Sequence, residues 1–130
     1  MSQQPVELIL MRHLASRLAV PVLVVDAAGD MVYFNEPAEP LVGRPFDEMR
    51  SWPFDEWTTS FRPEVDGLPL PVDELPAVIA LRRAIPAHRG FEYVDPDGIA
   101  RSIEASAFPI IGSDGRLIGA VSMFWEVSEP

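Results

Sequence analysis

Residues 114–126 read DGRLIGAVSMFWE and decide the fold expected for this chain. The Asp-Gly pair is a turn signal, and the apolar run behind it predicts a long strand over residues 116–128. Alternation divides its side chains between two faces, one with Ile118, Ala120, Ser122 and Phe124 and the other with Leu117, Gly119, Val121, Met123 and Trp125. Both faces are largely apolar. Because an antiparallel strand usually leaves one face to water, we expect this strand to be covered on both sides.

Four further strands are predicted upstream. Residues 22–26 form a short apolar run, and residues 31–35 follow a turn as the second strand of a hairpin. Turns at residues 95–98 and 112–115 separate strands over 90–95 and 99–111 from each other and from the last strand. These elements predict an α+β fold with a five-stranded antiparallel sheet.

An amphipathic helix is predicted ahead of the first strand, over residues 6–19. Its apolar stripe repeats at helical spacing and consists of Leu8, Met11, Ala15 and Leu18. Pro21 ends the helix, since the residue before a proline avoids the α region. The stripe can cover the molecule's own sheet or pack against a second copy, and both possibilities stay open.

A second helix is predicted over residues 73–85, with Asp73 as its cap and Pro76 in its first turn. Between residues 37 and 71, seven prolines leave room only for short helical turns such as 38–42 and 46–50. Large aromatic side chains fall in this region, so we expect an ordered cover over the sheet, not a linker.

Composition narrows the function. A chain of 130 residues fits one domain. Its formal net charge of −10 repels phosphate and anionic lipid, so we expect neither a nucleic-acid nor a membrane partner. With no cysteine, the chain has no disulfide, thiolate metal site or cysteine nucleophile. No leader or transmembrane pattern is visible, and we expect a cytoplasmic protein.

The order of these elements resembles the PAS fold over roughly residues 20–128. The first matching pieces are a hairpin ending in Asn35 (24–35), a glycine-ended helix (41–45) and the lead into the long helix (66–71 and 74–76). The others are the fourth strand and its approach (97–98 and 107–110) and the last strand with its exit (114–129). The proline-rich middle resembles PAS modules attached to bacterial phosphatases and kinases. We divide the chain into a cap or dimerisation helix, residues 1–20, and a PAS domain, residues 21–130.

The resemblance implies a sensory or docking module and not an enzyme. Such modules hold a small ligand between sheet and helices, or pair with other domains, often beside a kinase or phosphatase output domain. The candidate pocket residues are Phe46, Trp57, Val78, Leu81, Arg82, Tyr93 and Met123. The candidate homodimer contacts are Leu8, Met11, Ala15, Leu18 and Phe124. The alternative is a ligand-free interaction module with a filled core.

Individual motifs add little chemistry. Haem held by His88 is disfavoured, because this residue follows the predicted helix too late, and the absence of cysteine excludes a cysteinyl-flavin adduct. Whether the domain binds any other cofactor, and which one, stays open. Arg82 and its neighbours either compensate the helix dipole or dock an anionic ligand. Asn35 is expected to bond local backbone. We predict no catalytic residue and no metal site.

Overall fold

The computed structural model describes residues 5–46, 51–94 and 97–127. In chain order its elements are α1 (Val6–Ala15), β1 (Val22–Asp26), β2 (Met31–Phe34), the 3₁₀ turn η1 (Glu36–Ala38), α2 (Glu39–Val42), α3 (Phe54–Ser60), β3 (Glu64–Val65), β4 (Leu68–Pro69), the 3₁₀ turn η2 (Val72–Glu74), α4 (Pro76–Arg83), β5 (Ala87–Val94), β6 (Ala100–Ile111) and β7 (Leu117–Glu126). Most of the helical turn predicted over residues 46–50 lies outside the described residues.

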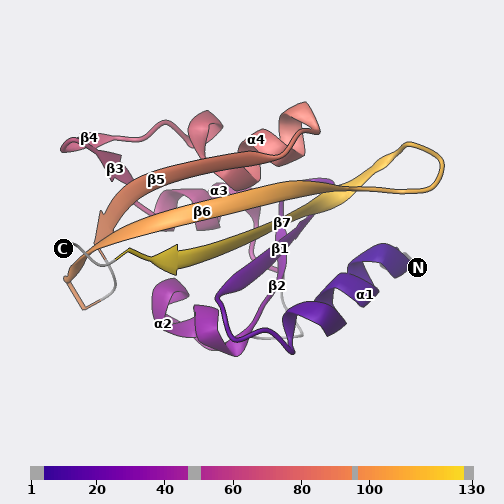
Figure 1. Ribbon diagram of the computed structural model, residues 1–130, viewed down its shortest axis with the longest axis horizontal. Helices are drawn as coiled ribbons and strands as arrows, with labels where there is room; N and C mark the ends of the chain where they lie inside the picture. The colour runs from indigo at the N-terminus through magenta and orange to yellow at the C-terminus, as the bar shows by residue number, and fades with distance from the viewer. Residues whose placement is uncertain (1–4, 47–50, 95–96, 128–130) are drawn as a thin grey trace.

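The strands form one antiparallel sheet in the order β2-β1-β7-β6-β5-β3-β4. Figure 1 shows the long strands β5, β6 and β7 crossing the molecule side by side. The prediction of five strands is wrong, because the described sheet has seven. The two additional strands, β3 and β4, span two residues each around a turn at Asp66 and Gly67, where φ is 54° and 80°. Two residues carry no readable alternation, so the pattern could not predict them.

Both predicted helices are shorter in the structure. The first stops at Ala15, whose carbonyl oxygen accepts a hydrogen bond from the Asn35 side chain at 3.0 Å. The second begins at Pro76 and not at Asp73, because Leu75 precedes the proline and is held extended at ψ 134°. Asp73 therefore lies in the preceding 3₁₀ turn and does not cap α4. The helix ends where Ala84 turns left-handed, at φ 55°.

Side chains pack on both faces of the sheet, as the doubly apolar last strand predicts. On one face α2, α3 and α4 cover a core that contains Trp57, Val78 and Phe124. On the other face α1 covers a smaller core that contains Leu8 and Val121. Figure 1 shows α1 on the side of the sheet away from α3 and α4. The N-terminal helix, one of the covers considered from sequence, thus packs on its own sheet.

A bulge near the start of β7 changes which way Ile118 faces. Ile110 pairs with Gly119 while Ile111 pairs with Leu117, so Ile118 is the extra residue between them. Its side chain packs with the core under α1, whereas Ala120 and Phe124 pack with the helices of the other face. The predicted face of Ile118 is therefore wrong, because the bulge shifts the alternation at this point.

Candidate functional site

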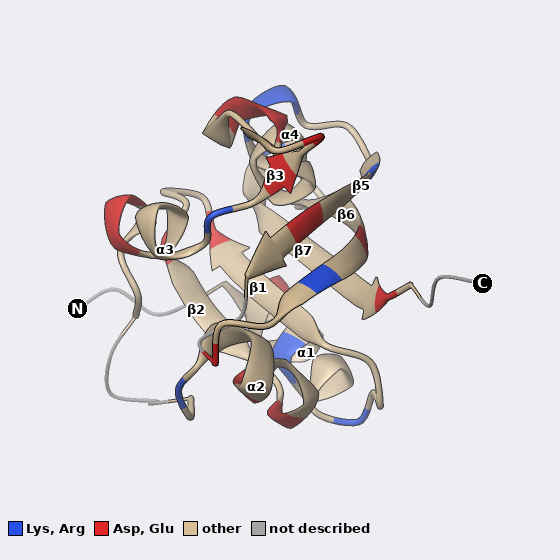
Figure 2. Cartoon of the chain, turned by 90° about the vertical axis from the view of Figure 1, so that its left-hand side faces the viewer, with Lys and Arg blue, Asp and Glu red and all other residues tan. Residues whose placement is uncertain are grey.

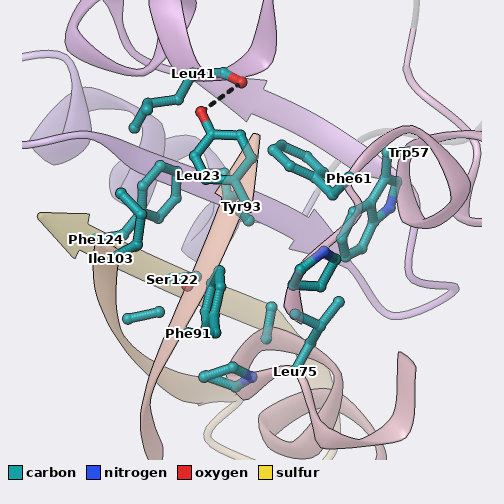
Figure 3. A pocket seen from close by; sticks show the side chains of 14 residues that line it. Leu23, Leu41, Trp57, Phe61, Leu75, Phe91, Tyr93, Ile103, Ser122 and Phe124 are labelled. Atoms are coloured by element: carbon teal, nitrogen blue, oxygen red, sulfur yellow. Dashed lines mark hydrogen bonds between the residues drawn. The ribbon is translucent and has the colours of Figure 1, made fainter. Parts of the chain in front are cut away.

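A small cavity of about 60 Å³ lies between the sheet and helices α3 and α4 (Figure 3). Its walls come from both layers. The lining residues are Leu23, Leu41, Trp57, Phe61, Pro63, Leu75, Pro76, Ala77, Phe91, Tyr93, Ile103, Ala105, Ser122 and Phe124. Among the described residues, none that lines it carries a formal charge. Five of the fourteen are aromatic, and most of the others are aliphatic.

The polar ends of the aromatic rings are bonded to the protein itself. The indole Nε1 of Trp57 donates to the carbonyl oxygen of Gly29 at 2.8 Å. The hydroxyl of Tyr93 donates to the carbonyl oxygen of Leu41 at 3.1 Å, the dashed line in Figure 3. These bonds fix both rings and leave their apolar surfaces toward the cavity.

Two surface clefts adjoin the cavity through shared walls. The first, of about 510 Å³, includes Trp52, Arg62 and Val94. The second, of about 310 Å³, includes Thr58, Arg62 and Val72. The side chain of Phe61 lines both clefts and the cavity. Leu41 and Tyr93 are also shared with the first cleft, and Pro63 and Leu75 with the second, but only Phe61 lines all three spaces.

The helical side chains that form this wall follow from the local sequence. Pro53 precedes the first turn of α3, which then places Trp57 inward with 3 % of its surface exposed. Phe61 ends the same helix in an extended conformation, at ψ 131°. Pro63 follows in the wall, so the chain leaves α3 and enters β3 directly over the cavity.

The sequence also matches a known protein family over most of its length. The model of the PAS_4 family, described as PAS fold, matches residues 15–130. The chain belongs to the PAS-fold family. No curated protein matches the sequence.

Solved structures share the PAS fold at low sequence identity. The PAS domain of BvgS from Bordetella pertussis is 17 % identical with a TM-score of 0.66, covering 95 % of this chain and 87 % of that chain. The PAS domain of nitrogen regulation protein NR(II) from Vibrio parahaemolyticus is 16 % identical with a TM-score of 0.59, covering 91 % and 98 %. A phage VqmA–DPO complex is 15 % identical with a TM-score of 0.64, covering 94 % and 53 %.

In this PAS domain, two of the seven predicted pocket residues, Trp57 and Tyr93, line the cavity. Phe124, predicted for a dimer interface, also lines it, because it shares a face of β7 with Ser122. Met123 faces the opposite way and packs under α1. Because successive side chains of a strand point to opposite faces, Met123 and Phe124 cannot both face the pocket. The alternation in the sequence was therefore enough to exclude Met123 once Phe124 faced the cavity.

The remaining pocket candidates lie elsewhere in the helical layer. Phe46 packs edge-on against Tyr33 and Phe34, with ring centroids 4.9 and 5.4 Å apart. Val78 and Leu81 are buried in the core without lining the cavity. Arg82 is exposed, forms an ion pair with Asp73 and stacks over the ring of Phe54. Its place outside the cavity follows from its position in the last turn of α4.

The predicted dimer stripe lies against the PAS domain's own sheet. Leu8 and Ala15 are each only 1 % exposed, and Met11 and Leu18 pack partly buried beside them. The opposite side of α1 carries exposed apolar side chains that the stripe did not include. These are Val6, Ile9, Leu10 and Leu14, exposed by 61, 43, 62 and 55 %.

The charged groups considered from sequence are outside the cavity. Nε2 of His88 lies 2.9 Å from a carboxylate oxygen of Glu104, and the His88 ring is 5.9 Å from that of Trp125. His88 belongs to β5, not to the end of α4, and pairs with Ser106 of β6. Figure 2 shows the Asp and Glu positions, in red, distributed over several elements of the domain. In the described ranges no group of three or more His, Asp or Glu side chains could hold a metal ion.

Leu23, Leu41, Leu75, Ile103 and Ser122 are cavity residues that the sequence prediction missed. The wall residues from the sheet share one face of their strands, which is a usable signal once the strand pairing is known. The pairing itself joins strands far apart in the sequence, and no local pattern predicts it.

No helix in the described part of the chain is long and apolar enough to cross a membrane.

Proposed function

We propose that this PAS domain is a sensory module that binds a small molecule in the cavity between its sheet and helices α3 and α4. The observation that carries the proposal is a space with apolar walls between the sheet and helices α3 and α4. A bound apolar molecule would fill this space and add contacts with its aromatic walls.

The cavity must widen to admit a ligand. Its volume is about 60 Å³, whereas an engineered cavity of about 150 Å³ holds benzene and ordinary ligand pockets start near 300 Å³. Phe61 is the side chain whose rotation would join the cavity to both surface clefts. We infer that this ring is the gate. The phage VqmA, a protein of the same fold, was solved in complex with DPO, which gives the proposal a precedent within the fold.

The residues that line the cavity favour a sensory role over a catalytic one, because almost none of them can take up or release a proton. General acid–base catalysis needs a titratable group near the reacting atoms. In the described lining the only such group is the Tyr93 phenol, whose proton is already donated to Leu41. We propose that occupancy is transmitted through β7, which contributes Ser122 and Phe124 to the wall. A kinase or phosphatase as the recipient stays a prediction, as does the cytoplasmic location.

The experiment that tests this function combines native mass spectrometry of the purified chain with titration by toluene, followed by two-dimensional NMR. We expect a retained non-protein mass, or toluene-induced shifts at the amides of the lining residues. Ala105→Val should abolish both effects, because two added carbons at a fully buried wall position fill the void.

Ala100→Val is the matched control, since it makes the same change at an exposed position of the same strand. It should bind as the wild type does. If neither a retained mass nor toluene shifts are found in the wild type, the cavity is not a ligand site. The ligand-free interaction module would then be the better description.

A second candidate function rests on the outer side of α1. Four apolar side chains there are more than 40 % exposed, while the inner side of the same helix is buried. A helix that is apolar on both sides is usually covered on both. We propose that a second copy of the domain covers this outer face, with Leu10 near the centre of the contact.

A further inference from the structure

The most informative group in the cavity is the hydroxyl of Ser122. We infer that the ligand of this PAS domain is an uncharged, ring-containing molecule with a hydrogen-bonding group that meets the Ser122 hydroxyl. The inference rests on the proposed function, because it names the chemistry of the molecule that would fill the same cavity.

Ser122 is buried, and its side chain has no hydrogen-bonding partner among the described residues. Only 4 % of its surface is exposed. Its side-chain oxygen makes no hydrogen bond within the described parts of the chain, although buried hydroxyls are nearly always bonded. The residue lines the cavity, and Figure 3 shows it on β7 among the apolar walls. A molecule that filled the cavity would therefore lie beside this residue.

The other polar groups of the wall are not available in this way. Trp57 and Tyr93 both donate to backbone carbonyl oxygens, so a ligand that used them would have to break an existing bond. Ser122 needs no such exchange. Its hydroxyl can donate to a ligand oxygen or accept from a ligand donor. It is therefore the position at which the cavity can distinguish a polar ring from a plain hydrocarbon.

The charge of the ligand follows from the rest of the wall. No described lining residue is charged, and Arg62, which lines both adjoining clefts, is exposed and shares those clefts with the acidic Glu64. An ionised group drawn into this cavity would lose its hydration without gaining a counter-ion. A charged ligand should therefore bind far more weakly than its neutral counterpart.

The shape of the ligand follows from the rings. Trp57, Phe61, Phe91, Tyr93 and Phe124 surround the space, and aromatic groups pack favourably against rings face to edge or with offset stacking. A flat ring gains contact with several of these walls at once. A flexible chain would gain less and lose more conformational freedom.

Three probes of similar size test the inference: phenol, toluene and benzoate, each titrated into the full chain and followed by amide chemical shifts. We expect phenol and toluene to bind and benzoate not to bind. In Ser122→Ala, the ratio of phenol to toluene affinity should fall by about three- to tenfold, the usual worth of a hydrogen bond. The melting temperature of Ser122→Ala should be unchanged or higher, because the substitution removes an unbonded hydroxyl.

Ser106→Ala is the matched control. It removes the same hydroxyl from the neighbouring strand, at a position paired with Met123 on the other face of the sheet. Its phenol-to-toluene ratio should equal that of the wild type. A lower melting temperature for Ser122→Ala with an unchanged ratio would show that the hydroxyl is structural, and would overturn the inference.

The outcomes separate this inference from the proposed function. If toluene and phenol bind but Ser122→Ala leaves their ratio unchanged, the cavity is a ligand site and the assigned role of Ser122 is wrong. Binding of benzoate as tight as that of phenol overturns the assigned charge. If no probe perturbs the lining amides of the wild type or of Phe61→Ala, which opens the wall, both proposals fail.

Discussion

Asn35 links the N-terminal helix to the sheet through a single side-chain amide. It is 1 % exposed. Its amide oxygen accepts from the backbone N–H of Val22 at 2.9 Å, and its NH₂ donates to the carbonyl oxygens of Ala15 at 3.0 Å and Val20 at 2.8 Å. The sequence indicated a structural asparagine bonding local backbone. The partners lie 13 to 20 residues away, because the chain passes back beside the end of β2.

Asp26 is a residue whose ionisation should lower stability at neutral pH. Burial raises the pKa of its carboxyl, and the negative charge of Asp30 raises it further, while backbone N–H donors act in the opposite direction. A carboxyl with a raised folded-state pKa binds its proton more tightly in the folded state. Its contribution to stability is therefore greatest at low pH and is lost as pH rises through that pKa.

Asp26→Asn should raise the melting temperature at pH 7. The amide oxygen can keep the two bonds that Oδ1 accepts from the N–H groups of Ala28 and Asp30, both at 3.0 Å, while the charge is removed. The advantage over the wild type should shrink as pH falls below the raised pKa of Asp26. Thermal melts of both proteins from pH 3 to pH 8 check this, and an advantage independent of pH would contradict it.

At the scale of elements, β7 depends on a glycine at its bulge. A Cβ at Gly119 would lie 2.2 Å from the carbonyl oxygen of Val25, far inside contact distance, and both atoms belong to paired strands that cannot move apart independently. Gly119→Ala should therefore destabilise the domain by about 3 kcal/mol or more, since overpacking typically costs 1–3. Chemical denaturation measures the difference.

Gly115→Ala is the comparison for that experiment. Gly115 lies in the turn before β7 at φ 82°, with no atom within 4 Å of an added Cβ. Only the left-handed conformation is penalised there, by about 1–2 kcal/mol. Equal losses in the two variants would show that β7 shifts to accommodate the methyl group at position 119.

Elements with a long repeating pattern could be predicted from the sequence, and elements set by pairing could not. The five main strands lie close to where alternation and turn residues place them. The PAS resemblance itself is confirmed by the family model. The two-residue strands, the early end of α1 and the face of Ile118 depend on long-range contacts or on a bulge, which leave no periodic trace.

The cavity was predicted less well than the fold because its lining is a product of packing. Trp57 and Tyr93 could be chosen as large side chains with a polar end. Leu23, Ile103 and Ser122 become neighbours only when β1, β6 and β7 pair. A serine within an apolar strand, such as Ser122, cannot be identified as a cavity residue until the packing around it is known.

At the scale of the whole molecule, the outer face of α1 predicts self-association. Leu10→Glu should weaken a dimer at least tenfold, because it puts a carboxylate where Leu10, 62 % exposed in the monomer, would be buried. Sedimentation equilibrium measures the change. Leu68→Glu is the control, since it makes the same substitution at a residue 70 % exposed on β4.

Salt gives an independent check on the same dimer. Each chain carries a formal charge of −10, so two copies repel each other over a distance that added salt shortens. The wild-type dimer should therefore become tighter as the salt concentration rises. A monomer at all salt concentrations, or equal effects of Leu10→Glu and Leu68→Glu, would contradict the proposed contact.

The pairing of β1 with β7 also sets a limit on how this chain can fold as it is made. Val22 lies opposite Met123, so the first strand and its last neighbour are about one hundred residues apart. At synthesis rates of about 5–20 residues per second, the β1–β2 hairpin waits on the order of 5–20 s before β7 can join it. During that interval an apolar strand has an open edge, which is the condition under which chains pair with one another. Slow translation of the second half of the message should therefore reduce the yield of folded protein, and chaperones that bind exposed strands should restore it.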